Sequence, residues 1–178
     1  MQYTTFETNW GYVAIAGRDG VLCRLCLPTA DQRTAQRGIL RAFDSLHEDM
    51  QPDEAFLPDL QERIVAYFEG ENVDFSTDPM VSLDGLSPFD RKVLLTCRKI
   101  PLGETTTYGD LATRVGHPGA ARAVGGALAR NPIPLIIPCH RVLHADGTLG
   151  GFSAPGGIKT KQRLLRHEQS PQILALRR

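Results

Sequence analysis

The chain has 178 residues, of which 42% are apolar and 22% charged, a composition typical of soluble globular proteins and unlike disordered, collagenous or coiled-coil chains. It carries 20 Lys and Arg and 20 Asp and Glu, so its formal net charge is zero. The charges are unevenly distributed, because residues 1–84 hold 6 basic and 15 acidic side chains whereas residues 85–178 hold 14 and 5. This asymmetry predicts two units, the second of which is suited to a polyanion.

Neither the cysteines nor the N-terminus indicates a secreted or membrane protein. The four cysteines are too few for a disulfide scaffold, and the N-terminus shows no signal-peptide pattern. No apolar run approaches the roughly 18 residues of a membrane span. We therefore expect a protein of the cytoplasm, or of the nucleus if its source is eukaryotic, with no membrane contact.

Cys23 and Cys26 form a CxxC pair, which would suit a redox couple or half of a zinc site. The surrounding run from Val21 to Leu27 is typical of a strand, in which positions three apart point to opposite faces. No second CxxC or HxxxH completes a tetrahedral site. We therefore interpret both cysteines as small core residues and predict no metal.

The first half has the pattern of a small α+β domain with an antiparallel sheet, which we place at residues 1–80. A turn signal at Arg18-Asp19-Gly20 joins its first two strands, and Pro28 should end the second. The expected elements are strands at 12–16 and 21–27, a helix at 31–46, a helix at about 60–68 stopped by Gly70, and a short strand at 72–75.

After a linker at about 76–87, the pattern becomes mostly helical, with helices expected from Phe89 to about residue 100, at 108–115 and at 120–130. Cys97 falls on the apolar stripe of the first of these helices and should be a core residue. Thr107 and Asp110 have the spacing of a capping box at the start of the second. The last two helices, joined by a glycine-containing turn at 116–119, form a possible helix-turn-helix.

The last of these helices consists almost entirely of Ala and Gly, with consecutive glycines at Gly125 and Gly126. Each glycine costs about 1 kcal/mol relative to Ala inside a helix, so close approach of another backbone must compensate. Either tight helix packing or docking against a nucleic-acid groove would require such small side chains. In the second case Arg122, the one long side chain among them, would enter a minor groove or replace a flipped base.

A reactive centre is indicated at Cys139, which follows three prolines and precedes His140 and Arg141. The nucleophilic form of cysteine is the thiolate, which an adjacent imidazole or guanidinium stabilises. An inert buried cysteine remains an alternative, as does a zinc ligand that would recruit His144 and His167.

The segment Pro138–Val142 resembles the active-site motif of the O6-alkylguanine-DNA alkyltransferases, and the resemblance extends over about residues 86–168. The further matching blocks are Thr107–Ala112, Ala121–Ala127, Asn131–Pro134, Gly150–Ser153, Gly157–Lys159 and Leu164–Glu168. The resemblance implies a ribonuclease-H-like N-terminal domain. It also implies a C-terminal DNA-binding and alkyltransferase domain at 86–170, with a winged-helix-like helix-turn-helix.

By this resemblance, Cys139 takes the alkyl group from O6 of guanine in DNA, and possibly from O4 of thymine, once and without a cofactor. His140 would deprotonate Cys139 through a water, and Glu168 would orient His140. Tyr108 would donate a proton to the leaving base. Asn131 would form the hinge between the recognition helix and the active-site segment.

The resemblance also implies how DNA binds. The partner would be duplex DNA, bound through its minor groove by a monomer, cooperatively in some cases, with the damaged nucleotide flipped out. Arg122 would fill the gap, and the small residues Ala121, Ala123 and Gly125 would fit the groove. In the pocket, the implied contacts are the N–H of Ser153, the carbonyls of Cys139 and Val142, the ring of Phe152, and nearby Lys159.

Two other functions are compatible with parts of the pattern. A binding-only damage marker or helix-turn-helix regulator would not need Cys139, and a cysteine hydrolase would not need the Ala/Gly helix with Arg122. Both are therefore disfavoured.

Overall fold

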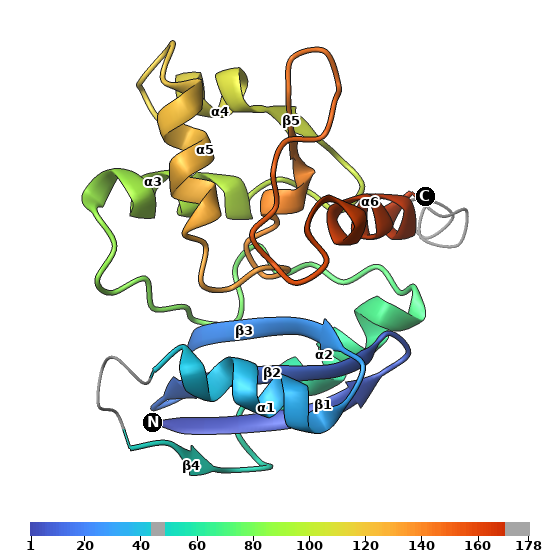
Figure 1. The fold of residues 1–178 in the computed structure, drawn as a ribbon. Coiled ribbons are helices and arrows are strands. Elements are labelled where there is room, and N and C mark those ends of the chain that lie inside the picture. The colour runs from blue at the N-terminus through green and yellow to red at the C-terminus, as the bar shows by residue number, and fades with distance from the viewer. Residues whose placement is uncertain (44–48, 170–178) are drawn as a thin grey trace.

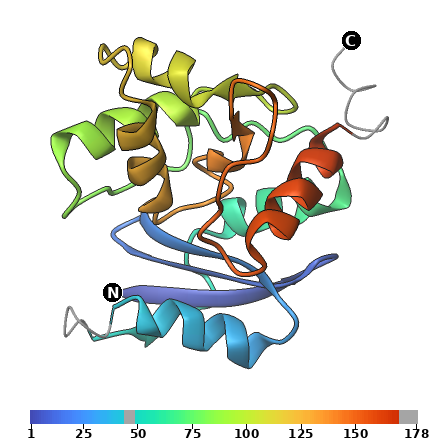
Figure 2. The same cartoon turned by 45° about the horizontal axis from the view of Figure 1, so that its top comes forward.

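A four-stranded sheet forms the lower part of the molecule in the computed structural model, which describes residues 1–43 and 49–169 (Figure 1). The strand order is β3-β2-β1-β4; β4 runs parallel to β1, and the other neighbours are antiparallel. Helix α1 covers one face of the sheet and α2 lies on the other (Figures 1 and 2). The elements are β1 (Gln2–Thr8), β2 (Gly11–Arg18), β3 (Val21–Thr29), α1 (Gln32–Arg41), β4 (Gln51–Pro52) and α2 (Pro58–Glu69).

The predicted α+β class is confirmed, as is the β2–β3 hairpin, although three details of this half differ. Strand β1 was not predicted, and β3 continues through Pro28 because its outer edge lacks a strand partner, where proline is tolerated. The expected strand at 72–75 is wrong. The carbonyl of Phe75 accepts a hydrogen bond from Arg98 Nε at 2.8 Å, so it is bonded to a side chain and not to a neighbouring strand.

The prediction that Cys23 and Cys26 face opposite sides is also wrong. Both are half-buried against the cluster under α1, because an irregularity in the β2–β3 register lets Leu22 and Leu25 share the other face. Helix α1 starts after Asp31, whose carboxylate accepts from the Thr34 N–H, and ends at Arg41. The rest of its predicted span, from residue 44, lies outside the described residues.

Helices and short strands build the upper part of the molecule. As predicted, Thr107 caps α4, accepting from the Asp110 N–H at 3.0 Å; its hydroxyl also donates to the Asp110 carboxylate. No helix in the described ranges is both long and apolar enough to cross a membrane. The elements are α3 (Pro88–Arg98), β5 (Thr106–Thr107), α4 (Tyr108–Arg114), α5 (Ala121–Ala129), the 3-10 turn η2 (Cys139–Arg141), β6 (Val142–Leu143) and α6 (Gly157–Glu168).

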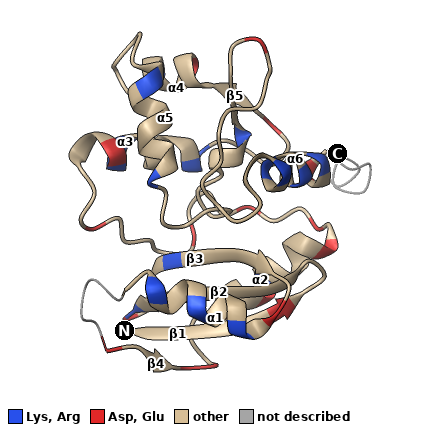
Figure 3. Ribbon diagram, viewed as in Figure 1, with Lys and Arg blue, Asp and Glu red and all other residues tan. Residues whose placement is uncertain are grey.

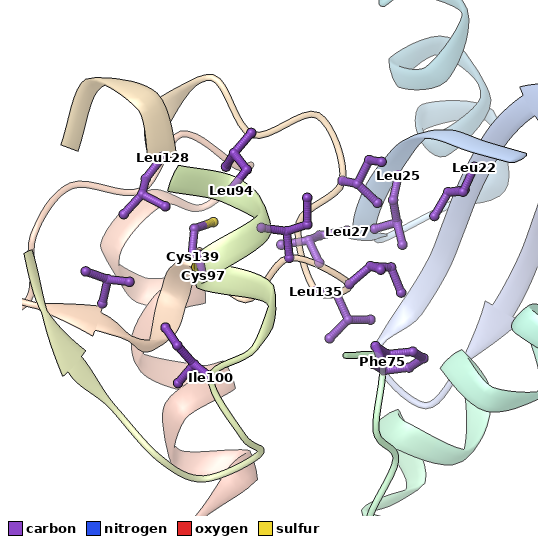
Figure 4. Close-up of a cluster of buried hydrophobic side chains, with 14 of the residues drawn as sticks. Leu22, Leu25, Leu27, Phe75, Leu94, Cys97, Ile100, Leu128, Leu135 and Cys139 are labelled. Atoms are coloured by element: carbon purple, nitrogen blue, oxygen red, sulfur yellow. The ribbon is translucent and has the colours of Figure 1, made fainter. Parts of the chain in front are cut away.

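One buried hydrophobic cluster joins the two parts of the molecule. It contains Leu22 and Leu25 from β3 together with Leu94 and Leu135 from the C-terminal part (Figure 4). The outer edge of β3 is hydrogen-bonded to that part as well, with Leu25 N donating to Pro132 O at 3.1 Å. The expected boundary between residues 80 and 86 stays a prediction, and units on either side of it would share one core.

Replacing Leu25 by Ala tests this shared core. Because the side chain is 3% exposed, we expect the free energy of unfolding to fall by about 2–5 kcal/mol. Unfolding should remain a single transition when followed in urea both by fluorescence of Trp10, the only tryptophan, and by far-ultraviolet circular dichroism. Two separated transitions in the wild-type chain would contradict a shared core.

Candidate active site

A rigid turn between α5 and η2 holds Cys139. The amide of Asn131 ties it together: Oδ1 accepts from Ile133 N at 3.0 Å, and Nδ2 donates to Ile137 O at 2.8 Å. Leu135 adopts a left-handed φ of 79°, a strained conformation that the flanking bonds must stabilise. The same Nδ2 lies 3.2 Å from Cys139 Sγ, as a hydrogen-bond donor. The predicted hinge residue therefore touches the predicted nucleophile directly.

The Cys139 thiol is 7% exposed and lies at the N-terminus of the η2 turn. Burial raises its pKa, while the hydrogen bond from Asn131 and the charge of Lys161 offset part of that rise. The neutral thiol therefore predominates at neutral pH, and a base is needed to generate the nucleophile.

Beside Cys139, the buried Glu168 carboxylate collects hydrogen bonds from three side chains. Its Oε1 lies 2.8 Å from His140 Nε2, and the Tyr67 hydroxyl donates to the same oxygen at 2.8 Å. Arg141 binds both oxygens, with Nε at 2.9 Å from Oε2 and a terminal nitrogen at 2.8 Å from Oε1. Three segments distant in sequence thus meet at one carboxylate.

These contacts determine the protonation states of the pair. Burial alone would raise the pKa of Glu168, but the charges and hydrogen bonds of His140 and Arg141 outweigh it and hold that pKa far below its usual range. Burial lowers the pKa of His140, which Glu168 only partly offsets. Because an ionised carboxylate can only accept, the hydrogen of neutral His140 is assigned to Nε2. Its Nδ1 is left as an acceptor, buried and without a partner.

A cavity of about 550 Å³ opens over Cys139. Seven of the predicted site residues line it: Tyr108, Ala121, Arg122, Gly125, Cys139, Phe152 and Ser153. Ala123 is exposed on α5, and Val142 is buried in β6; neither is part of the lining.

Tyr108 packs closely against two glycines at this cavity, and only Gly150 could not carry a side chain. A Cβ on Gly150 would lie 2.2 Å from the Tyr108 hydroxyl oxygen, so no side chain fits there. A Cβ on Gly125 would lie 3.8 Å from the same ring, in ordinary contact. Position 125 therefore borders the tyrosine ring from α5 with room for a methyl group, a contact not predicted from the sequence.

Comparisons with known proteins show which family this chain is similar to. The family model for the 6-O-methylguanine DNA methyltransferase DNA binding domain matches residues 88–170. A methylated-DNA–protein-cysteine methyltransferase from Mycolicibacterium paratuberculosis is 38% identical over 181 residues, 99% of this chain and 98% of that one. The chain belongs to the methylated-DNA–protein-cysteine methyltransferase family.

Solved structures extend the likeness to the whole chain. Mycobacterium tuberculosis OGT, crystallised in complex with DNA, matches with a TM-score of 0.77 and 34% identity over 100% of both chains. The O6-methylguanine-DNA methyltransferase of Pyrococcus kodakaraensis matches with a TM-score of 0.69 and 28% identity, over 95% of this chain and 99% of that one. The α+β fold is therefore that of the family.

Lys161, rather than the predicted Lys159, is the buried lysine of the site. Lys159 is exposed on α6 and does not line the cavity, whereas Lys161 is fully buried, with Nζ 2.6 Å from Val142 O and 5.7 Å from the centre of the Tyr108 ring. Residues two apart on a helix point to nearly opposite sides, and Lys161 is seven residues, or two turns, before Glu168. Helical periodicity could have identified Lys161, whereas nothing local in the sequence indicates the contact of Tyr67 with Glu168.

The alternative of a zinc ligand gains no support. Within the described ranges, no three His, Cys, Asp or Glu side chains are grouped so that they could hold a metal ion. His167 instead has Nε2 2.6 Å from the Tyr67 carbonyl oxygen, and His144 packs on the Tyr108 ring. Cys97 is fully buried on α3, in agreement with the prediction of a core residue.

Replacing Asn131 by Ala should make Cys139 less reactive. Loss of the donor to Sγ removes a contact that lowers the thiol pKa, so the pH profile of alkylation by iodoacetamide should shift to higher pH. The measurement is the mass of the Cys139 peptide over time. Cys26 serves as the unaffected internal control, and new reactivity at the buried Cys97 would reveal unfolding instead.

Replacing Glu168 by Gln should lower the free energy of unfolding at pH 7 by about 3–5 kcal/mol, since Arg141 is then buried without a counter-charge. In the wild type, the depressed pKa of Glu168 contributes stability that is present above about pH 4.3 and is lost as the pH falls further. Urea titrations between pH 3 and 7 measure both effects. An equal loss of stability with acid in the variant would argue against this role of Glu168.

Proposed function

We propose that this protein repairs alkylated guanine in DNA directly, by transferring the alkyl group from O6 to Cys139. The observation that carries the proposal is a buried thiol at a cavity of nucleobase scale, with a neutral histidine next to it in sequence and an ionised glutamate behind that histidine. The similar proteins are methylated-DNA–protein-cysteine methyltransferases, and M. tuberculosis OGT has been crystallised in complex with DNA.

The reaction begins with removal of the thiol proton. His140 Nδ1 is the free acceptor, and a water between it and Cys139 would carry the proton, because neighbouring residues in the chain seldom bond side chain to side chain. Glu168 holds His140 in this tautomer and stabilises the imidazolium that forms, as in other nucleophile–base–carboxylate sites. Arg141 and Tyr67 in turn hold Glu168.

The thiolate then attacks the alkyl carbon in line with its bond to O6. The S–C bond forms as the C–O bond breaks, and the electron pair of that bond stays on the guanine. Tyr108, which lines the cavity, donates a proton to the leaving base; burial raises its phenol pKa, so it is protonated at neutral pH. The products are S-alkylcysteine and neutral guanine.

Guanine is held by backbone groups and one aromatic wall. The Ser153 N–H donates to its oxygen, the carbonyls of Cys139 and Val142 accept from its amine, and Phe152 stacks on the ring. The Val142 carbonyl already accepts from Lys161, which leaves its second lone pair for the base. Lys161 thereby supports this pocket, the role that the sequence analysis gave to Lys159.

Duplex DNA lies across α5, the second helix of the helix-turn-helix. A base stacked in a duplex cannot present its alkyl carbon to a buried thiol, so the damaged nucleotide is flipped into the cavity. Ala121, Ala123 and Gly125 let α5 enter the minor groove, and the exposed Arg122 at its N-terminal end fills the gap in the stack. A monomer suffices for this geometry.

Each molecule reacts once. The thioether at Cys139 has no easy leaving group, so the thiol is not regenerated, and the displacement itself uses no cofactor.

Incubation with duplex DNA carrying O6-methylguanine tests the proposal. We expect the Cys139 peptide to gain the mass of one methyl, with at most one methyl transferred per protein molecule. Cys139→Ala should bind the DNA and transfer none. Full repair by this variant, or methyl on another cysteine in the wild type, would refute the assignment.

A further inference from the structure

A second hollow of about 580 Å³ reaches Cys139 from the side of the N-terminal sheet. It runs between α1 and β3 on one side and residues 129–134 and 152–155 on the other. It shares Ala129, Cys139, Phe152 and Ser153 with the cavity described above. The two hollows therefore meet at the reactive thiol, and this second one, called the lateral groove below, plays no part in the chemistry proposed so far.

The lateral groove concentrates the positive charge of an otherwise acidic unit. Residues 1–84 contain 6 basic and 15 acidic side chains; three of the 6, Arg24, Arg37 and Arg41, line the groove, and no Asp or Glu within residues 1–43 and 49–169 does. Figure 3 shows basic segments on α1 and β3, with acidic ones around α2 and β4. Such segregation is unexpected if the arginines only improve solubility.

These three arginines are available to an external anion. None forms an ion pair with a carboxylate among the described residues, and Arg37 donates only a long bond of 3.3 Å to the Thr34 hydroxyl. The fourth arginine of the groove, Arg130, differs, because it binds both oxygens of the Asp90 carboxylate. On α1, Arg37 and Arg41 are four residues apart and so project from one face.

We propose that the lateral groove binds backbone phosphates of the DNA strand that carries the lesion, so that the N-terminal unit forms part of the DNA interface. This inference rests on the proposed function, since that function places a DNA nucleotide at Cys139. A strand whose nucleotide enters the cavity must continue on either side of it, and the groove begins at the same four residues. Arginine suits this contact, because its planar guanidinium binds phosphate oxygens in pairs.

The groove also changes how the uneven charge acts on DNA. A unit with 9 more acidic than basic side chains should repel DNA at low salt, but phosphates in the groove would meet arginines first. Each phosphate neutralised by Arg releases counterions and steepens the dependence of log K on log salt by about 0.9. The contact is therefore measurable as a slope, separately from protein stability.

The test uses the full chain with Arg37→Gln, Arg41→Gln and the double variant. Gln is as good a helix former as Arg, and both side chains are exposed, so α1 should be retained. Binding to duplex DNA containing O6-methylguanine is measured by fluorescence anisotropy with Cys139→Ala in the background. For the double variant we expect the slope of log K against log salt to be less steep by about 2. Its affinity for DNA, relative to that of the wild type, should therefore recover about tenfold between 50 and 200 mM salt.

Arg33→Gln is the matched control, because Arg33 is exposed on the same helix, outside the groove lining, and its loss changes net charge equally. Transfer from the free base O6-benzylguanine to Cys139 should be unchanged in all arginine variants, since this substrate has no phosphate. Wild-type affinity and slope in the Arg37 and Arg41 variants would overturn the proposal, as would an equal loss in the Arg33 control. Failure of the wild type itself to bind the DNA or to take the methyl group from its O6-methylguanine would instead refute the proposed function.

Discussion

The site depends on keeping one ionised carboxylate, Glu168, away from water. A buried charge is costly unless its hydrogen bonds are satisfied, and here His140, Arg141 and Tyr67 satisfy them from η2 and α2. Removing any partner leaves a buried charge or polar group unsatisfied. The positions of α6, the η2 turn and α2 are therefore coupled. The N-terminal unit, through Tyr67 of α2, is therefore connected to His140, the proposed base, by two consecutive hydrogen bonds.

The same burial that isolates Glu168 opposes the reactivity of Cys139. An apolar environment raises the thiol pKa and lowers the histidine pKa, so both groups are neutral before DNA arrives. A resting thiolate would react with any electrophile, whereas a neutral thiol next to a poised base becomes nucleophilic only when the proton can move. For a protein that can react only once, low reactivity in the absence of DNA preserves the single equivalent of thiol. Asn131, which both shapes the turn and donates to Sγ, links the backbone conformation to this balance.

Local sequence was sufficient to predict features whose reactive or structural residues are neighbours in the chain. Three features were predicted in this way, each from a local physical cause. They are the constrained turn before Cys139, the Thr107 cap and the Ala/Gly helix. Lys161 was not predicted, because the motif at residues 157–159 indicates Lys159, whereas the helical repeat aligns Lys161 with Glu168. The register irregularity that brings Cys23 and Cys26 to one face, and the contact of Tyr67 with a residue 101 positions away, arise from tertiary packing. No local pattern encodes such pairings.

The zero net charge conceals two levels of organisation. Between the halves, basic residues favour the C-terminal part, which carries α4 and α5. Within the acidic half, half of the arginines line one groove that reaches the thiol, and none of the Asp and Glu residues that the structure describes lines it. Counting charges along the sequence detects the difference between the halves. It predicts a negative charge for the groove, however, because it sums residues that lie on opposite faces of one sheet. Only the fold shows that Arg24 of β3 and Arg37 and Arg41 of α1 line one groove at Cys139, and this is why we infer that a unit with excess acid can attract a phosphate there.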